Sequence, residues 1–248
     1  MTATQLGLEA LGRLRVYFAH RSVGDNILDG VRALAAREGV SLRIEEARGR
    51  AGVAPGTLLH APVGDNGDPA GKIADFVRSV DGLGDVDVAL VKLCYADFHA
   101  GTEPDALFAR YHASLRDLRH RHPAVTFVHV TVPLTATQRG WRSVARQLLG
   151  RETSGAMNAR REAYSDRVRH AYGGSEPVFD LARLESMRPD GTREAWRWHG
   201  RTVPAMAAAY SDDGGHLNRA GMEKAARALL ELLATLSPTS APSRRDAP

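Results

Sequence analysis

Three polar residues near the two ends of the chain have the types and spacing of a nucleophile with its base. Ser22 follows an apolar segment and precedes a helical pattern, so an oxyanion formed there would face N–H groups at a helix start. A serine in that place is also a common helix cap. Asp213 and His216 supply what a nucleophilic serine needs, a base and a carboxylate that fixes its tautomer. Gly214 and Gly215 let the intervening backbone bend.

Other chemistries have weaker support in the sequence. An α/β-hydrolase nucleophile lies in Gly-x-Ser-x-Gly, whereas His20 occupies the first glycine position here. A metal site could use His20, Asp213 and His216. Cys94 could be a nucleophile, although a small buried hydrophobic residue is the better interpretation. One cysteine forms no internal disulfide or multi-cysteine zinc site, and no glycine-rich nucleotide motif is present, so we predict no cofactor and no metal.

The composition is that of a soluble globular protein. Of 248 residues, 43% are hydrophobic and 25% charged, which excludes a fibrous or disordered chain. The 33 Lys and Arg residues are interleaved with 29 Asp and Glu residues, which indicates a solvated surface and not a nucleic-acid-binding stripe. No segment approaches the roughly 20 apolar residues of a membrane span, and residues 1–14 lack a secretory-signal pattern. We therefore expect a cytoplasmic protein without a membrane or nucleic-acid partner.

Apolar periodicity predicts alternating strands and helices along the chain. The predicted strands are 14–19, 41–46, 86–91, 125–132 and 177–181. The predicted helices are 27–35, 69–80, 103–122, 157–172 and 217–236. Residues 48–68, rich in glycine and proline, are predicted to form a long loop, and 192–211 are interpreted as a short helix or an insertion near the site. This alternation predicts an α/β protein with a parallel sheet covered on both faces.

The predicted sheet also places the candidate site. Ligands of open parallel sheets bind beyond the carboxyl ends of the strands. Ser22 follows the first predicted strand, residues 92–97 follow the third, and 212–218 precede the last helix. One site built from both ends of the chain predicts a single domain over 1–236, followed by a Pro/Ser-rich, disordered tail over 237–248. The sequence predicts no oligomeric state.

Two segments resemble a known family. Residues 18–24, Phe-Ala-His-Arg-Ser-Val-Gly, and residues 213–221, Asp-Gly-Gly-His-Leu-Asn-Arg-Ala-Gly, resemble the serine motif and the Asp-x-x-His motif of the SGNH/GDSL hydrolases. The resemblance spans about residues 14–236. It implies a three-layer α/β/α, flavodoxin-like fold, here with a five-stranded parallel sheet. An SGNH-type active site would then lie at the two matching segments.

The resemblance also implies a role for each matching residue. Ser22 would be the nucleophile, His216 the general base and Asp213 its partner. The oxyanion hole would contain the N–H groups of Ser22 and of a glycine after the second strand. That glycine would be Gly52, with Gly49 as the alternative.

Two departures from the family pattern affect the site. His20-Arg21-Ser22 replaces Gly-Asp-Ser, so a cation that favours an anionic substrate stands beside the serine. Residues 94–97, Cys-Tyr-Ala-Asp, replace Gly-x-Asn-Asp, so an oxyanion donor that is worth about 10²–10³ in rate is missing. The side chains that could fill in or contact substrate are Arg21, Asn26, Lys92 and Asp97.

The function that this resemblance implies is ester hydrolysis. The substrate would be a small-molecule or carbohydrate ester, deacylated through an acyl-enzyme. An O-acyltransferase would use the same three residues and pass the acyl group to a hydroxyl other than water. A non-catalytic binding protein that keeps the fold is the alternative from another functional class.

Overall fold

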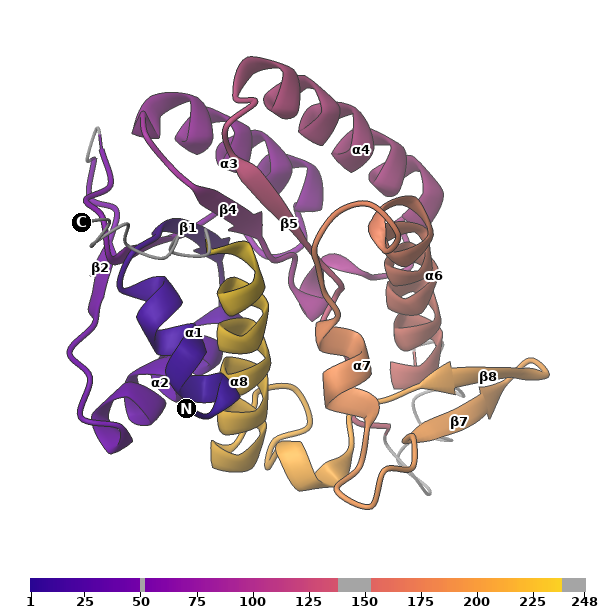
Figure 1. Cartoon of the computed structure of the whole chain (residues 1–248). Helices are drawn as coiled ribbons and strands as arrows, with labels where there is room; N and C mark the ends of the chain where they lie inside the picture. Colours follow the sequence, from indigo (N-terminus) through magenta and orange to yellow (C-terminus); the bar gives the residue numbers. More distant parts are fainter. Residues whose placement is uncertain (50–51, 138–152, 238–248) are drawn as a thin grey trace, which may run out of the picture.

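A six-stranded parallel sheet forms the centre of the molecule (Figure 1). The computed structural model describes residues 1–49, 52–137 and 153–237. The strands lie in the order β2-β3-β1-β4-β5-β6, and every neighbouring pair is parallel. Their bounds are Arg15–His20 (β1), Arg43–Glu46 (β2), Thr57–Pro62 (β3), Val88–Val91 (β4), Thr126–Val130 (β5) and Val178–Phe179 (β6). The predicted three-layer α/β/α fold is confirmed, whereas the predicted count of five strands is wrong.

Helices cover both faces of the sheet (Figure 1). One face carries Ala3–Leu11 (α1), Val23–Arg37 (α2), Leu181–Ser186 (α7) and Arg219–Leu236 (α8). The other face carries Pro69–Leu83 (α3), Pro104–Arg121 (α4) and Ser154–Tyr172 (α6). The short helices α1 and α7 were not predicted from the sequence.

Strand β1 shows why the sheet needs both layers. Val16 and Phe18 point into the core beneath α1, α2 and α8, whereas Tyr17 and Ala19 point into the core beneath α3 and α4. All four side chains are buried. Alternate side chains of a strand point to opposite faces, so a strand that is apolar at every position must lie between two helical layers.

Strand β3 corrects the prediction of a long loop over 48–68. Thr57–Pro62 pairs with β1 along its whole length and with β2 on its other side. Leu58 and Leu59 are buried in the two opposite cores. Glycine and proline residues surround this short run and conceal its apolar pattern in the sequence. The direct neighbour of β1 is therefore β3, and the predicted strand 41–46 is an edge strand.

Residues within the unassigned segment 192–211 form a β-hairpin. Ala195–Trp198 (β7) pairs antiparallel with Arg201–Pro204 (β8), and the hairpin projects beside α6 (Figure 1). Trp196 packs against Gly155 of α6 so closely that a Cβ at this glycine would fall inside the indole ring. The alternative of a short helix is wrong for β7 and β8, although a 3₁₀ turn follows at Ala208–Tyr210.

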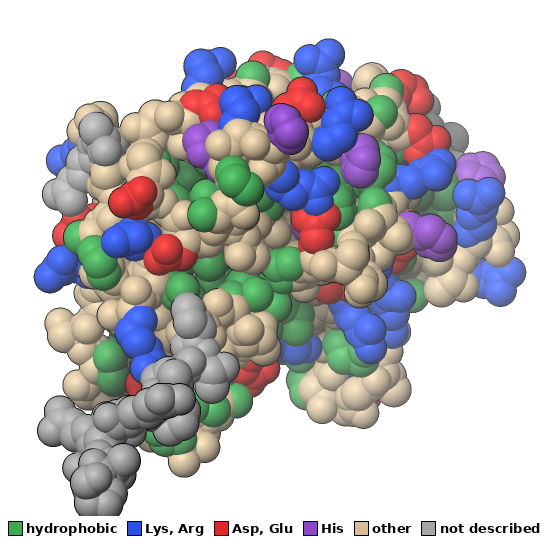
Figure 2. Space-filling view, turned by 45° about the horizontal axis from the view of Figure 1, so that its top comes forward, with side chains coloured by type: hydrophobic (Ala, Val, Ile, Leu, Met, Phe, Trp, Pro, Cys, Tyr) green, Lys and Arg blue, Asp and Glu red, His purple; other side chains and the backbone are tan. Residues whose placement is uncertain are grey.

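The described surface carries mixed charge. Figure 2 shows Lys and Arg side chains interleaved with Asp and Glu side chains over the face that it displays. Ion pairs connect the outer helices, for example Arg121 of α4 with Asp81 of α3 at 3.0 Å. Among residues 1–49, 52–137 and 153–237, no helix is long and apolar enough to cross a membrane. The predicted disordered tail lies outside the described residues, apart from Ser237.

Candidate active site

Ser22 stands at the sharp turn between β1 and α2. Its backbone has φ 54° and ψ −100°, a region that costs a non-glycine residue about 1–3 kcal/mol. Ser22 occupies the cap position of α2, yet its side chain makes no capping hydrogen bond. Its Oγ lies 3.1 Å from Nε2 of His216 instead. Gly24 makes the turn possible, because a Cβ there would collide with the ring of His20.

His216 is oriented by Asp213. The Nδ1 atom of His216 lies 2.7 Å from Oδ2 of Asp213. The other carboxylate oxygen accepts the N–H groups of His216, at 2.7 Å, and of Gly215, at 2.8 Å. These bonds hold the pKa of Asp213 well below its usual range, so the carboxylate stays charged. A carboxylate at Nδ1 keeps the proton on that nitrogen and leaves the Nε2 lone pair facing Ser22.

Packing between α2 and α8 brings these residues together from opposite ends of the chain. The Asn26 side chain in the first turn of α2 accepts the N–H of Leu217, directly after His216, at 3.1 Å. Gly30 of α2 lies against the backbone of α8, where a Cβ would collide with it. A helix–helix contact therefore positions Ser22 and His216, which are 194 residues apart in sequence. We call Ser22, His216 and Asp213 the triad.

A cavity of about 420 Å³ opens beside the triad. The segments that follow β4 and β5 form two of its walls, so it lies at the carboxyl ends of the strands. Its lining residues are Tyr95, Ala96, Phe98, His99, Thr135, Ala136, Thr137, Ser154, Met157, Arg161, Asp213, Gly214 and Gly215. Polar and apolar side chains both contribute, which suits a small substrate that has both kinds of group.

Two solved structures illustrate which known proteins share this architecture. A GDSL-like lipase from Bacteroides thetaiotaomicron superposes with a TM-score of 0.54 at 13% identity, over 94% of this chain and 97% of the lipase. The chain has the SGNH/GDSL hydrolase fold. A candidate platelet activating factor from Streptococcus pneumonia superposes with a TM-score of 0.53 at 11% identity, over 93% of this chain and 91% of that one. No protein-family model and no curated protein sequence matches.

The role of Gly52 as the oxyanion glycine remains a prediction. The register pairs His20 with Pro62, so Gly64 is the glycine level with Ser22. Gly52 is exposed, in the connection that leads from β2 into β3. Gly64 does not offer a free amide either, because its N–H donates to Asp75 at 2.8 Å. Gly49, the alternative, lies in the same β2–β3 connection as Gly52.

Two of the predicted substrate contacts are buried in the SGNH core. Lys92 is fully buried, and its Nζ lies 3.3 Å from the Leu93 carbonyl and 3.7 Å from Sγ of Cys94. Asp97 is fully buried and pairs with Lys72, whose Nζ lies 2.7 Å from its Oδ1. Neither side chain lines the cavity, so the structure gives no support to the predicted contacts of Lys92 and Asp97 with substrate.

Arg21 and Asn26 hold loops in place around the triad. The Arg21 guanidinium donates to the carbonyl of Val63 at 3.2 Å and to that of Gly64, and it lies 3.7 Å from Asp65. It therefore connects the serine turn to the end of β3. The Oδ1 atom of Asn26 accepts the N–H of Leu217, next to His216. Neither residue lines the cavity, and their predicted contact with substrate remains a prediction.

Tyr95, whose side chain stands beside the triad, is not among the site residues predicted from the sequence. Its hydroxyl lies 3.4 Å from Nε2 of His216, and the two rings meet edge to face at 5.9 Å. Arg161, on α6, donates to the Tyr95 carbonyl through Nε and Nη2 and lies under the phenol ring. The available signal was that Tyr95 directly precedes Ala96, which replaces the family asparagine.

The alternative chemistries lack the required geometry. His20 is buried and faces His60, with 3.2 Å between ring nitrogens, so it does not join Asp213 in a metal site. Within the described ranges, no three His, Cys, Asp or Glu side chains are grouped as metal ligands. Cys94 is buried, as expected for a small hydrophobic residue.

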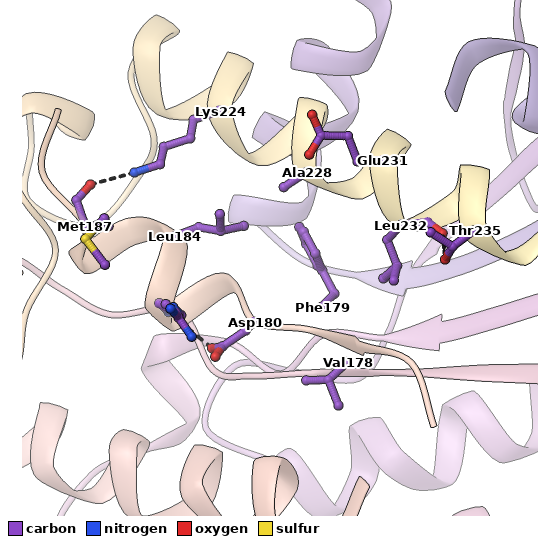
Figure 3. Close-up of a pocket in the computed structure, with 11 residues that line it drawn as sticks. Val178, Phe179, Asp180, Leu184, Met187, Lys224, Ala228, Glu231, Leu232 and Thr235 are labelled. Atoms are coloured by element: carbon purple, nitrogen blue, oxygen red, sulfur yellow. Dashed lines mark hydrogen bonds between the residues drawn. The ribbon is translucent and has the colours of Figure 1, made fainter. Parts of the chain in front are cut away.

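A second, more apolar groove of about 590 Å³ lies between α7 and α8 (Figure 3). Phe179, Leu184 and Leu232 project into it, and Lys224 crosses one end to donate to the Met187 carbonyl. No triad residue lines this groove, so it does not belong to the candidate active site.

Proposed function

We propose that this protein is a serine hydrolase that cleaves esters through an acyl-enzyme on Ser22. The observation that carries the proposal is the 3.1 Å contact between Ser22 Oγ and His216 Nε2, with Asp213 on the other ring nitrogen at 2.7 Å. A serine that only capped a helix would bond to that helix and would not need a positive φ. The SGNH fold that the chain shares with a GDSL-like lipase adds support.

Acylation begins at the Ser22 hydroxyl. Its Oγ forms a bond to the ester carbonyl carbon while its proton passes to Nε2 of His216. The carbonyl electron pair moves to oxygen and creates the oxyanion. Asp213 stays charged and stabilises the imidazolium. Collapse of the oxyanion breaks the bond to the alcohol, and the Nε2 proton goes to the departing oxygen.

Deacylation repeats these steps with water. His216 takes a proton from a water molecule whose oxygen attacks the acyl carbon. The second oxyanion collapses, the bond to Ser22 Oγ breaks, and the proton on Nε2 returns to that oxygen. The acid leaves, and the free triad is restored.

The cavity supports a small-molecule or carbohydrate ester with a short acyl group as substrate. Its volume of about 420 Å³ is near the small end of ligand sites. Ser154 offers a hydroxyl group to a polar alcohol, and Phe98 and Met157 offer apolar surface to a short acyl chain. Acetate esters therefore suit the site better than long-chain esters.

The test is hydrolysis of p-nitrophenyl acetate by matched variants. Ser22→Ala and His216→Ala should each lose turnover by a factor on the order of 10⁴ or more. Ser175→Ala changes an exposed serine after α6 and should retain wild-type turnover. The proposal fails if the wild type hydrolyses no ester, or if Ser22→Ala is as active as the wild type.

A further inference from the structure

Tyr95 presents a hydroxyl group beside the triad, in the segment where the family resemblance implies a side-chain donor. It opens the 3₁₀ turn Tyr95–Asp97 that directly follows the end of β4. The resemblance aligns this turn with the segment that carries the family asparagine, and Ala96 has no donor to replace it. Ala96 is exposed, whereas the Tyr95 ring is partly buried against the core. Of these two residues, only Tyr95 presents a polar group to the triad.

The Tyr95 backbone is fixed from two sides. Asp97 accepts the N–H of Cys94 at 2.7 Å and is itself held by the buried Lys72 ammonium. Arg161 donates to the Tyr95 carbonyl at 3.1 and 2.9 Å. A donor held this rigidly needs little reorganisation when charge develops next to it, which is the condition for effective oxyanion stabilisation.

The hydroxyl of Tyr95 shares its acceptor with the nucleophile. Ser22 Oγ lies 3.1 Å and Tyr95 Oη 3.4 Å from the same atom, Nε2 of His216. Gly215 permits this approach, because a Cβ there would come within 3.1 Å of the phenol oxygen. In the free enzyme, two O–H groups therefore face one lone pair.

Proton transfer resolves this competition. When Nε2 takes the Ser22 proton, it loses the lone pair that could accept from Tyr95. At that moment the carbonyl oxygen, one bond from the carbon that Ser22 has attacked, becomes an anion. We propose that the Tyr95 hydroxyl then donates to this oxyanion and replaces the missing asparagine as the side-chain donor of the oxyanion hole. The inference rests on the proposed hydrolase function.

The protonation of Tyr95 is consistent with a donor role. Burial raises the pKa of the phenol, and the nearby Asp213 carboxylate raises it further. The phenol therefore keeps its proton throughout the neutral range. A bond that forms only as charge develops stabilises the transition state more than the bound substrate, so it should affect kcat more than KM.

Tyr95→Phe tests the inference, because it removes the hydroxyl and keeps the ring. We expect kcat for p-nitrophenyl acetate to fall about 10²–10³-fold, with KM nearly unchanged. The matched control is Tyr111→Phe, which removes a buried hydroxyl bonded to His129 at 2.8 Å, away from the triad, and should retain wild-type kcat. A boronic acid that mimics the tetrahedral state should bind Tyr95→Phe more weakly by about the factor lost in kcat/KM.

Two esters with different leaving groups separate this role from proton donation to the alcohol. An oxyanion donor predicts a similar loss in Tyr95→Phe for p-nitrophenyl acetate and for phenyl acetate. A loss confined to phenyl acetate, the poorer leaving group, would overturn the inference. An active wild type with a Tyr95→Phe kcat within about threefold of it would overturn the inference alone, because one lost oxyanion donor should cost far more. A wild type that hydrolyses neither ester would refute the proposed function as well.

Discussion

The substitution Asp97→Asn should destabilise the protein strongly, because it leaves a buried ammonium without a counter-charge. Both side chains of the Lys72–Asp97 pair are fully buried. The Lys72 Nζ lies 2.7 and 2.9 Å from the two carboxylate oxygens and 2.9 Å from Oδ1 of Asn66. Asp97 also accepts the N–H groups of Cys94 and Gly67 at 2.7 and 3.0 Å. Both carboxylate oxygens of Asp97 therefore already accept hydrogen bonds, and an asparagine would lose one of these acceptors.

The magnitude follows from this burial. Removing one partner of a buried ion pair costs about 3–5 kcal/mol, whereas an exposed pair contributes about 0–1 kcal/mol. A domain is stable by about 5–15 kcal/mol, so Asp97→Asn should remove a large part of the free energy of unfolding. The control is Asp105→Asn, which breaks the exposed pair with Arg167 at 3.0 Å and should cost less than about 1 kcal/mol.

The assay is urea unfolding followed by circular dichroism. Asp97→Asn should lower the midpoint far more than Asp105→Asn, with similar slopes for both. Adding Lys72→Met to Asp97→Asn removes the unpaired ammonium, so the double variant should be more stable than Asp97→Asn alone. Equal urea midpoints for Asp97→Asn and Asp105→Asn would refute this prediction, since the unpaired buried ammonium would then have no measurable effect on stability.

Three further outcomes are expected. Asp213→Asn should keep the fold and lower kcat about 10⁴-fold, because the amide no longer holds the Nδ1–H tautomer of His216; a loss below tenfold in ester hydrolysis would contradict this. Burial raises the pKa of Glu185 to about 8, above its unfolded value, so the wild type should lose stability relative to Glu185→Gln between about pH 4.5 and 8. Glu185→Gln should not share that loss, and urea midpoints with parallel pH dependence would show that Glu185 is ionised in the folded state. Gly155→Ala should cost about 1–3 kcal/mol and red-shift the tryptophan fluorescence, because its Cβ would displace Trp196; an unshifted spectrum would mean that the hairpin is not seated on α6.

The alternation of strands and helices could be predicted because each apolar run has a clear period. Leu58 and Leu59 of β3 were missed, since two residues between glycine and proline neighbours establish no period. The hairpin could not be predicted for the same reason, because β7, which carries the two tryptophans, and its partner β8 are both too short to show a period.

The triad could be predicted because its pattern is local at each end. Asp213 and His216 share one turn, and Ser22 directly follows a strand. The positive φ of Ser22 could not be predicted, because non-glycine residues rarely adopt this region and the residue type gives no signal for it. Lys72 and Asp97 could not be paired from sequence, since they are 25 residues apart and belong to different elements.

Tyr95 shows the limit of aligning a motif by position. The sequence places Ala96 at the asparagine position and directs attention away from its neighbour. The 3₁₀ turn and the carbonyl contact with Arg161 decide which side chain faces His216, and neither can be read from residue types. The register of β3, which places Gly64 and not Gly52 two residues beyond the partner of His20, has the same origin in long-range pairing.

The central claim, that Ser22 is a nucleophile activated by His216, is tested most directly by covalent labelling. The folded protein is incubated with a fluorophosphonate, and the adduct is located by intact mass and peptide mapping. We expect a single adduct on Ser22, which His216→Ala should suppress although the serine is still present. An unlabelled wild type, or an adduct on any residue other than Ser22, would contradict it.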